Sequence, residues 1–366
     1  MKFMPARRAA RTAAAAPLAA MLLLSACGGS EEAEEAAPAP APVEAAPVEE
    51  APVEEVAGLD EICAAGAEEG SFSYWATFAD ENFARIEEVF ASTYPGIEID
   101  FLALRSDEIV QRVITASTAG QDIEVDLANG DLDELKAMFD RELTDTEVDW
   151  SALGVADDLI HSTNMVRIYR VPLGLAYNSS LSTPDDLPDT WFELAAEEYR
   201  GEFIVDPRGN PFSQLSLYWG AEDTLAYVQR LKEFDPVVIR GGTAGMLEVV
   251  AGNYLTTTGG RDDSRAELQA DGAPIEIKYL DVIPTTDFYN VLFKDSPSSN
   301  AAACFAGWLM TEEGQAIHTE VEFKANESVP PTAPAGAIIV SIETGEDADA
   351  AAAVAEQVSA IWTTEG

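Results

Sequence analysis

The chain has 366 residues and a formal net charge of −45 at pH 7, with 66 Asp and Glu against 21 Lys and Arg. Such an acidic chain is poorly suited to bind nucleic acid or an anionic membrane face, because its own charge repels phosphate groups. We interpret the acidic residues as a solvated surface suited to salty surroundings. The alternative is a protein that stores calcium or another cation, but the sequence contains no EF-hand spacing. Hydrophobic residues make up 47% of the chain, which is ample for a core, and the length suggests two lobes.

The amino end, residues 1–26, has the pattern of a lipoprotein signal peptide. Four basic residues precede an apolar run over 12–24 that is too short to span a membrane. Leu24-Ser25-Ala26-Cys27 resembles a bacterial lipobox, which implies cleavage before Cys27 and lipidation of its sulfur and new amine. We therefore expect a protein of the cell envelope, outside the cytoplasm and lipid-anchored to a bacterial membrane. The alternative is an ordinary cysteine near an ordinary cleavage site.

Residues 27–57 are predicted to be the lipidated cysteine followed by a disordered tether. From residue 28 the segment contains Ala, Pro, Val, Glu, Gly and one serine, and Ala-Pro-Val-Glu recurs at Ala41, Ala46 and Ala51. A segment of this composition cannot bury enough apolar surface to offset its ordering entropy. Proline and like charges keep it extended, at about 3.1 Å per residue. It would hold the following residues away from a membrane surface.

Two cysteines remain in the part that follows, Cys63 and Cys304. Outside the cytoplasm an even pair favours a disulfide. Two buried free thiols are the alternative.

The first elements after the tether alternate between helix and strand. Strands are expected over 71–77, 97–104 and 122–130, and a short helix is expected before them at 61–69. Further helices begin at Asp80, around Ile109 and after Asp131, where Glu134 completes a capping-box-like start. This alternation predicts β-α-β units and a mostly parallel sheet.

A second α/β rhythm follows an extended crossing segment at 170–178. A capping box of Thr190 and Glu193 predicts a helix over 190–199. The other elements expected are strands at 202–206, 237–240 and 275–280, a helix at 243–251, a helix around Ala301–Leu309, and a last helix spanning Ala350 to Ile361. The fold class predicted is therefore α/β.

The sequence offers little for catalysis. The two histidines, His161 and His318, lack metal-ligand spacing and are expected to be ordinary surface or capping residues. There is no H-E-x-x-H, G-x-S-x-G, P-loop or strand-following G-x-G-x-x-G motif. We therefore expect no enzyme activity, no cofactor and no metal. A secreted hydrolase would need a nucleophile and base that we cannot identify.

The candidate binding residues lie in loops at the carboxyl ends of the strands. Open α/β sheets bind ligands at these ends, and the N-termini of the helices that follow present free N–H groups. Three arginines stand out in a chain with few cations, and their guanidinium groups suit carboxylate or phosphate. The others would supply hydroxyl, amide and backbone N–H groups. The predicted ligand-binding residues are Thr77, Arg105, Ser106, Asn129, Arg208, Asn210, Thr243, Thr258 and Arg261.

Four segments together resemble the extracellular solute-binding proteins of ABC transporters, in the branch that includes ferric-iron binders. The firmest match is SPSSNAAACFAGWLMTEEGQ (296–315). It is similar to a run of the family in which a proline and an asparagine precede an Ala-rich helix that ends in Trp-Leu and is followed by Glu-Gly-Gln. The other matches are PLGLAYNSS (172–180), LPDTWFELAAEEYRGEFIVDPRGNP (187–211), and GGTAGMLEVVAGNY (241–254) followed by DGAPIEI (271–277). The resemblance covers nearly all of Ser71 to about Val329.

The resemblance implies a two-lobed periplasmic-binding-protein fold of type II, with hinge strands and a central ligand cleft. It also implies discontinuous lobes, which the residue pattern alone does not reveal. Lobe 1 would comprise 58–169 with 282–329, and lobe 2 would comprise 170–281 with 330–366.

One departure from the family concerns the metal. Iron-binding members carry adjacent tyrosines shortly after the segment matched by GNYLTTT, and this chain has GGRDDS (259–264) there. Tyrosine-based ferric binding is therefore not expected, and Arg261 fits an anion better than a bare cation.

We accordingly expect a membrane-anchored receptor that captures a small anionic solute and delivers it to an ABC importer. Its partners would be the solute, the permease with its ATPase and, through the lipid, the membrane; we expect a monomer and no nucleic acid. The alternatives are a ferric-ion receptor without the tyrosine pair, and a structural or adhesive surface lipoprotein.

Overall fold

The computed structural model describes residues 58–326 and 330–364. The predicted signal peptide, Cys27 and the tether lie outside these residues. Among the described residues, no helix is both long and apolar enough to cross a membrane.

The first elements alternate as the sequence predicts. Their bounds are α1 (Leu59–Glu69), β1 (Ser71–Ala76), α2 (Asp80–Thr93), β2 (Glu98–Ala103), α3 (Ser106–Ala119), β3 (Leu127–Asp131) and α4 (Leu132–Phe139). Phe83, Ile86 and Phe90 of α2 are buried at helical spacing. At α4 the Asp131 carboxylate accepts a hydrogen bond of 3.2 Å from the backbone N–H of Glu134, so this helix begins where the predicted cap lies.

The middle of the chain begins with a long strand and continues with short elements. They are β4 (Val166–Asn178), β5 (Phe203–Val205), α5 (Phe212–Trp219), α6 (Ala221–Lys232), β6 (Val237–Val238), α7 (Gly242–Val250), β7 (Thr256–Arg261), α8 (Asp262–Ala270) and β8 (Ile275–Lys278). Single 3₁₀ turns lie at Asp157–Leu159, Pro184–Asp186, Trp191–Leu194 and Glu197–Tyr199.

A second long strand opens the last part of the chain. The elements are β9 (Val282–Leu292), α9 (Ser299–Leu309), α10 (Glu312–Glu322), β10 (Ile338–Val340) and α11 (Gly345–Thr363). Every residue of α9 from Ala301 to Leu309 is buried, which explains why its sequence is almost continuously apolar.

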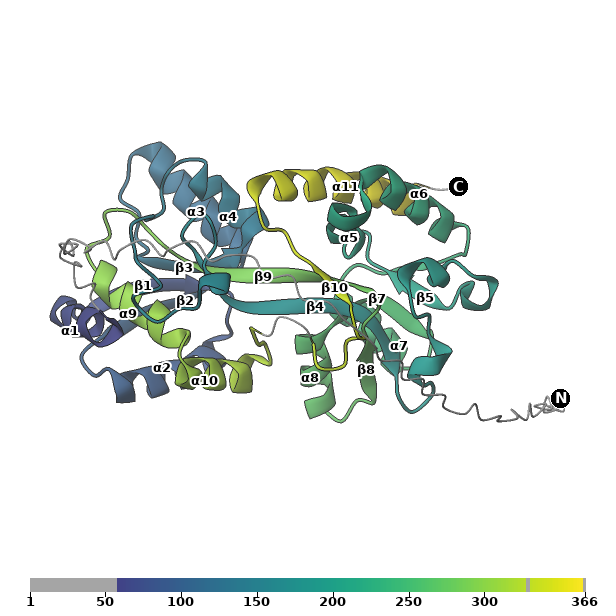
Figure 1. The fold of residues 1–366 in the computed structure, drawn as a ribbon, viewed down its shortest axis with the longest axis horizontal. Coiled ribbons are helices and arrows are strands. Elements are labelled where there is room, and N and C mark those ends of the chain that lie inside the picture. Colours follow the sequence, from purple (N-terminus) through teal and green to yellow (C-terminus); the bar gives the residue numbers. More distant parts are fainter. Residues whose placement is uncertain (1–57, 327–329, 365–366) are drawn as a thin grey trace, which may run out of the picture. The chain divides into compact units, whose positions relative to one another are not determined.

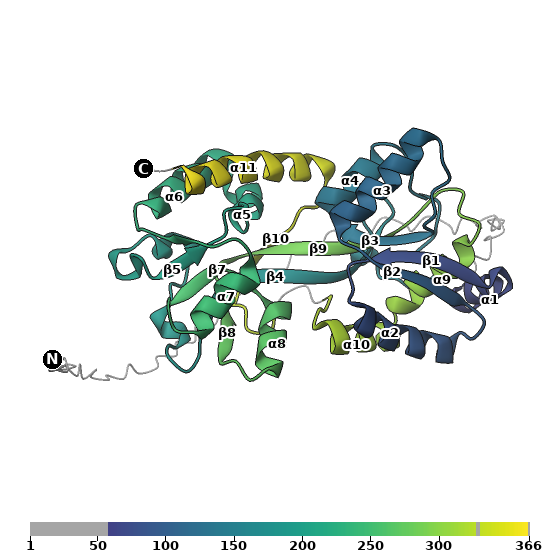
Figure 2. The same ribbon diagram turned by 180° about the vertical axis from the view of Figure 1, so that it is seen from behind.

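One sheet joins all the strands, in the order β2-β1-β3-β9-β4-β7-β5-β6, with β10 on β9 and β8 on β4. β1 pairs in parallel with β2 and β3, and β5 pairs in parallel with β6 and β7. Between these groups, β4 and β9 are antiparallel to each other and run from one group to the other (Figures 1 and 2). The mostly parallel pairing predicted from the alternation of strands and helices is therefore found in the two outer groups, and antiparallel pairing joins them in the middle.

Two sets of hydrophobic clusters separate the fold into two lobes. The first lobe is built by β1–β3, α1–α4, α9 and α10, whose apolar side chains pack together around Phe305 and Leu135. The second is built by β5–β8, α5–α8 and α11, around Phe212 and Met246. We use "first lobe" and "second lobe" for these sets of elements; the exact boundaries predicted from the resemblance stay a prediction.

Two local predictions are wrong, and one strand is absent from the predictions. Residues 190–199 form two 3₁₀ turns instead of a helix, because Trp191 is anchored in the core, where its Nε1 donates to the carbonyl of Val282 at 2.8 Å. Residues 257–261, expected as a loop, belong to strand β7 between β4 and β5. Strand β9 was not predicted, because Pro284 and Asp287 interrupt its apolar pattern.

A disulfide joins Cys63 of α1 to Cys304 of α9. Both cysteines are buried in the first lobe, so the bridge ties the start of the described chain to a helix 241 residues further along the sequence.

Candidate functional site

The first lobe places three polar side chains where β1, β3 and β4 come together. The Thr77 hydroxyl, just after β1, donates to Oδ1 of Asn129 at 2.8 Å and lies 3.1 Å from the hydroxyl of Tyr169. Asn129 is fully buried and donates through Nδ2 to the carbonyl of Tyr289. These bonds fix the Thr77 hydroxyl between two partners, as expected for a group positioned before a ligand arrives.

The ring of Tyr169 in β4 contacts three side chains. It stacks on Phe288 and on His318, with ring centroids 4.6 and 5.2 Å apart, and Nζ of Lys324 lies 5.0 Å from its centroid. Burial raises the pKa of Tyr169 to about 12, although the nearby Lys324, the Thr77 hydrogen bond and Arg261 act in the opposite direction. The phenol is therefore protonated at neutral pH and can donate a hydrogen bond.

The second lobe contributes Arg261, the last residue of β7. Its Nε and Nη2 donate to the two carboxylate oxygens of Asp263 at 3.1 and 2.7 Å. The side chain of Asp263 is 10% exposed and that of Arg261 is 34% exposed. Burial alone would raise the pKa of Asp263, but the hydrogen bond and charge of Arg261 hold it below its usual value. Both groups are therefore charged, and Asp263 fixes the orientation of the guanidinium.

Arg208 follows β5 and repeats this arrangement. Its Nε and Nη2 donate to the carboxylate of Asp206, which also accepts from the backbone N–H of Gly241 at 3.0 Å. The Arg208 side chain is 55% exposed, whereas that of Asp206 is 7% exposed. Gly209, next in sequence, has φ of 106° and lies against Ala355 of α11. A Cβ added to Gly209 would come within 2.7 Å of the Cα of Ala355. A glycine is thus required for the chain to pass there.

Contacts connect these groups. Nζ of Lys324 lies 5.0 Å from the ring centroid of Tyr169, and Lys324 and Asp263 line the same cavity. A Cβ on Gly242, next to the Gly241 that donates to Asp206, would lie 3.6 Å from Cδ of Arg261. The structure therefore brings together residues from both lobes, which we call the interlobe cluster: Thr77, Asn129, Tyr169, Asp206, Arg208, Arg261, Asp263 and Lys324.

Two predicted residues lie at the start of α3, outside this cluster. The Arg105 side chain is 78% exposed and pairs with Asp107 at 3.1 Å. Ser106 is buried, and its hydroxyl helps to lower the pKa of Asp131, although burial raises that pKa overall. No contact in the described structure connects either residue with Arg208 or Arg261, so their role in binding stays a prediction.

The other predicted residues either contact a neighbouring polar side chain or are buried. Asn210 accepts from the Ser213 hydroxyl at 2.8 Å, and the hydroxyls of Thr243 and Ser264 are 3.0 Å apart. Thr258 was expected in a loop but is completely buried inside β7, and its hydroxyl makes no hydrogen bond to a described residue. Its position within a strand, instead of after one, places it away from solvent.

Sequence reasoning missed Tyr169, Asp206, Asp263 and Lys324. Asp263 carried the clearest signal, because a carboxylate two residues after an arginine can orient its guanidinium. Tyr169 and Lys324 carried no such signal, since only the fold brings β4 and the end of α10 together. His318 was also misjudged as a surface or capping residue. It is completely buried beside Phe78 and Tyr169, and burial lowers its pKa to about 3.

The segment 259–264, where the resemblance leads one to expect the family's tyrosine pair, forms the end of β7 and the start of α8. Tyr74, a tyrosine that could be considered instead, is buried and donates to Asn290 at 2.9 Å. Among the described residues no group of three or more His, Cys, Asp or Glu side chains could hold a metal ion.

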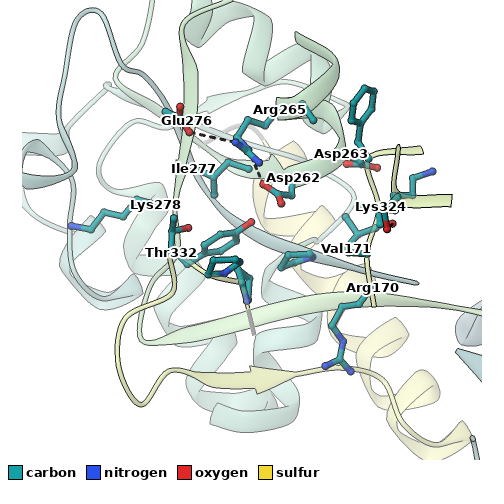
Figure 3. A pocket seen from close by; sticks show the side chains of 18 of the residues that line it. Arg170, Val171, Asp262, Asp263, Arg265, Glu276, Ile277, Lys278, Lys324 and Thr332 are labelled. Atoms are coloured by element: carbon teal, nitrogen blue, oxygen red, sulfur yellow. Dashed lines mark hydrogen bonds and ion pairs between the residues drawn. The ribbon is translucent and has the colours of Figure 1, made fainter. Parts of the chain in front are cut away.

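A separate cavity of about 640 Å³ adjoins the interlobe cluster at Asp263 and Lys324 (Figure 3). Its other walls include parts of β4, α8 and β8, residues between 319 and 325, and residues between 330 and 334. None of the nine predicted binding residues lines it.

The sequence matches no protein-family model and no curated protein. Solved structures do match: iron-bound HitA from Pseudomonas aeruginosa aligns at 15% identity with a TM-score of 0.63, over 79% of this chain and 99% of that chain. IdiA (FutA) from Trichodesmium, in complex with iron and citrate, aligns at 14% identity with a TM-score of 0.64, over 80% and 98%. The substrate-binding protein of an ABC transporter from Agrobacterium tumefaciens aligns at 13% identity with a TM-score of 0.62, over 80% and 96%.

These matches confirm the resemblance at the level of fold. The structural neighbours are ferric-binding and ABC-transporter solute-binding proteins, and the chain has their two-lobed architecture.

Proposed function

We propose that the chain is a receptor that binds a small anionic solute between its lobes and delivers it to an ABC importer. Cys27 would carry the lipid that anchors it outside the cytoplasm, and the permease with its ATPase would be its protein partners. Its role would be binding by a monomer, without catalysis. The two-lobed fold supports the receptor, and the interlobe cluster supports the anion.

One observation carries the proposal: two guanidinium groups of the second lobe are each held through Nε and Nη2 by a carboxylate two residues away. The carboxylate of Asp206 accepts a hydrogen bond from Nε of Arg208, and that of Asp263 accepts one from Nε of Arg261. Within the described chain, Nη1 of neither arginine donates a hydrogen bond. Each guanidinium therefore keeps N–H groups for a second partner, and a carboxylate or phosphate can accept two of them at once.

The hydrogen-bond donors of the cluster favour a small anion, whereas its charges are balanced by nearby carboxylates. Arg208, Arg261 and Lys324 pair with Asp206, Asp263 and, outside the cluster, Glu322, so these three pairs are together neutral in a chain of net charge −45. The hydroxyls of Thr77 and Tyr169 add donors from the first lobe. An anion held by both lobes would favour the closed arrangement, because it makes more contacts there.

A ferric ion is the second candidate, because HitA and IdiA are described as bound to iron. Here Tyr169 would be the phenol nearest the cluster, but Arg261 and Lys324 beside it would repel a bare cation. Iron could enter only together with an anion that the arginines bind. Titration with ferric ion, with and without citrate, would separate these cases by a tyrosinate-to-iron absorption band.

The test is thermal unfolding of the full chain with phosphate, sulfate, phosphonates, dicarboxylates, amino acids, sugars, polyamines and ferric ion. A ligand at a hundred times its Kd adds about 2.7 kcal/mol to the free energy of unfolding. With the anion that shifts the midpoint, Arg261→Ala should weaken binding about tenfold or more. Arg85→Ala, which removes an exposed ion pair with Glu320, is the control. No shift with any compound, after removal of co-purified ligand, would favour a structural or adhesive lipoprotein.

A further inference from the structure

The cavity beside the interlobe cluster has the size of a small-molecule site. Its volume of about 640 Å³ lies within the range of roughly 300–1,000 Å³ in which proteins bind cofactors and drug-sized ligands. Its lining comes from β4, from α8 and β8 of the second lobe, from the end of α10 of the first lobe with the residues just after it, and from residues between 330 and 334. Figure 3 shows Arg265, Ile277 and Lys324 around this space.

The charged groups of the cavity already have partners. Arg265 donates through Nε to Asp262 at 2.7 Å and lies 3.6 Å from Glu276 (Figure 3). Lys278 donates to the carboxylate of Asp189 and to two backbone carbonyls. Because these charges are compensated within the protein, an ion entering the cavity would lose its hydration without gaining a free counter-charge. The cavity therefore favours an uncharged ligand.

The remaining lining has three hydroxyl side chains, Tyr279, Thr319 and Thr332, and a larger apolar part that is rich in rings. The apolar part includes the prolines 172, 184, 330, 331 and 334 together with Tyr177, Ile277 and Phe323. The rings of proline and of the aromatic residues are rigid, so they provide contact area at a low cost in side-chain entropy. They suit a ligand that is itself a flat ring, since it can lie against several of them at once.

We propose that this cavity is a second binding site, for an uncharged ring-bearing small molecule. It differs from the anion site, because Arg208, Arg261 and Thr77 do not line it, whereas Asp263 and Lys324 lie at its border with the cluster. A molecule in it would contact elements of both lobes. This site does not depend on which solute the interlobe cluster binds, and it can be tested without that solute.

The test uses Nile red, an uncharged aromatic dye whose fluorescence rises in apolar surroundings, titrated into the full chain. Exposed apolar residues such as Leu181, at 69% exposure, will also take up dye, so the result is a difference between variants. Ala266 of α8 lines the cavity, and Ala270 lies on the same helix outside it. Ala266→Trp should fill the cavity and weaken saturable binding about tenfold or more. Ala270→Trp should leave it unchanged.

A second pair of variants guards against misfolding of the first. Thr332 is an exposed lining residue on the opposite side, and Ala335 is exposed nearby but not part of the lining. Thr332→Trp should reproduce the loss, and Ala335→Trp should not. Equal dye binding by each filling variant and its control, or the absence of a saturable component in the unmodified chain, would overturn the proposal.

Discussion

The buried ion pair of the crossing strands gives the sharpest stability prediction. Asp287 of β9 accepts from Nε and Nη2 of Arg170 of β4 at 2.7 and 2.5 Å, and from the Thr285 hydroxyl at 3.1 Å. Arg167 approaches the same carboxylate at 3.5 Å. The exposed fraction of the side chain is 8% for Arg170 and 2% for Asp287. The pair therefore lies in a nearly dry region where β4 and β9 connect the lobes.

Asp287→Ala would leave two buried guanidinium groups without their shared carboxylate. Removing the acid of a buried pair in this way costs about 3–5 kcal/mol, because the arginine charges stay desolvated without this carboxylate. Replacing Arg170 by Met in the same chain removes the nearer of the two guanidinium charges. We therefore expect the double variant to be less destabilised than the sum of the single ones, by about 2 kcal/mol or more.

Urea denaturation followed by circular dichroism measures these free energies of unfolding. Glu320→Ala, which breaks the exposed pair with Arg85, is the control and should cost no more than about 1 kcal/mol. A loss below about 1 kcal/mol for Asp287→Ala, or additivity of Arg170→Met and Asp287→Ala within about 0.5 kcal/mol, would refute the reasoning.

Three further outcomes are expected. Replacing Cys63 and Cys304 by Ala should lower the free energy of unfolding by up to about 5 kcal/mol, because the bridge closes a loop across 241 positions; a loss under about 1 kcal/mol would contradict this. Burial lowers the pKa of His318 to about 3, so only the unfolded chain takes up this proton between about pH 6.5 and 3, and stability falls as the pH falls. In His318→Leu the slope of unfolding free energy against pH should decrease by about 1.4 kcal/mol per unit in that window; an unchanged slope would show that His318 is protonated in the fold. Tyr169→Phe, which removes the hydroxyl beside Thr77, should cost about 1 kcal/mol in the same urea assay, and no change would mean that this hydrogen bond contributes nothing net.

Local patterns determined the elements of the first lobe. Phe83, Ile86 and Phe90 recur at the spacing of one helix face, and Asp131 with Glu134 marks a helix start. Such signals depend on neighbours in the sequence, so they can be read without knowing the fold. The order of four segments also predicted the two-lobed architecture, which the structural matches confirm.

Tertiary structure alone decided the middle of the sheet and the composition of the site. Residues 256–261 became a strand because β4 and β5 lie on either side to pair with them, although their sequence contains two glycines. Tyr169 joined the site because the pairing of β4 with β9 places it beside Thr77, which is 92 residues away in sequence. Contacts of this kind arise when distant segments pair and bury each other, and the local sequence carries no record of the partner.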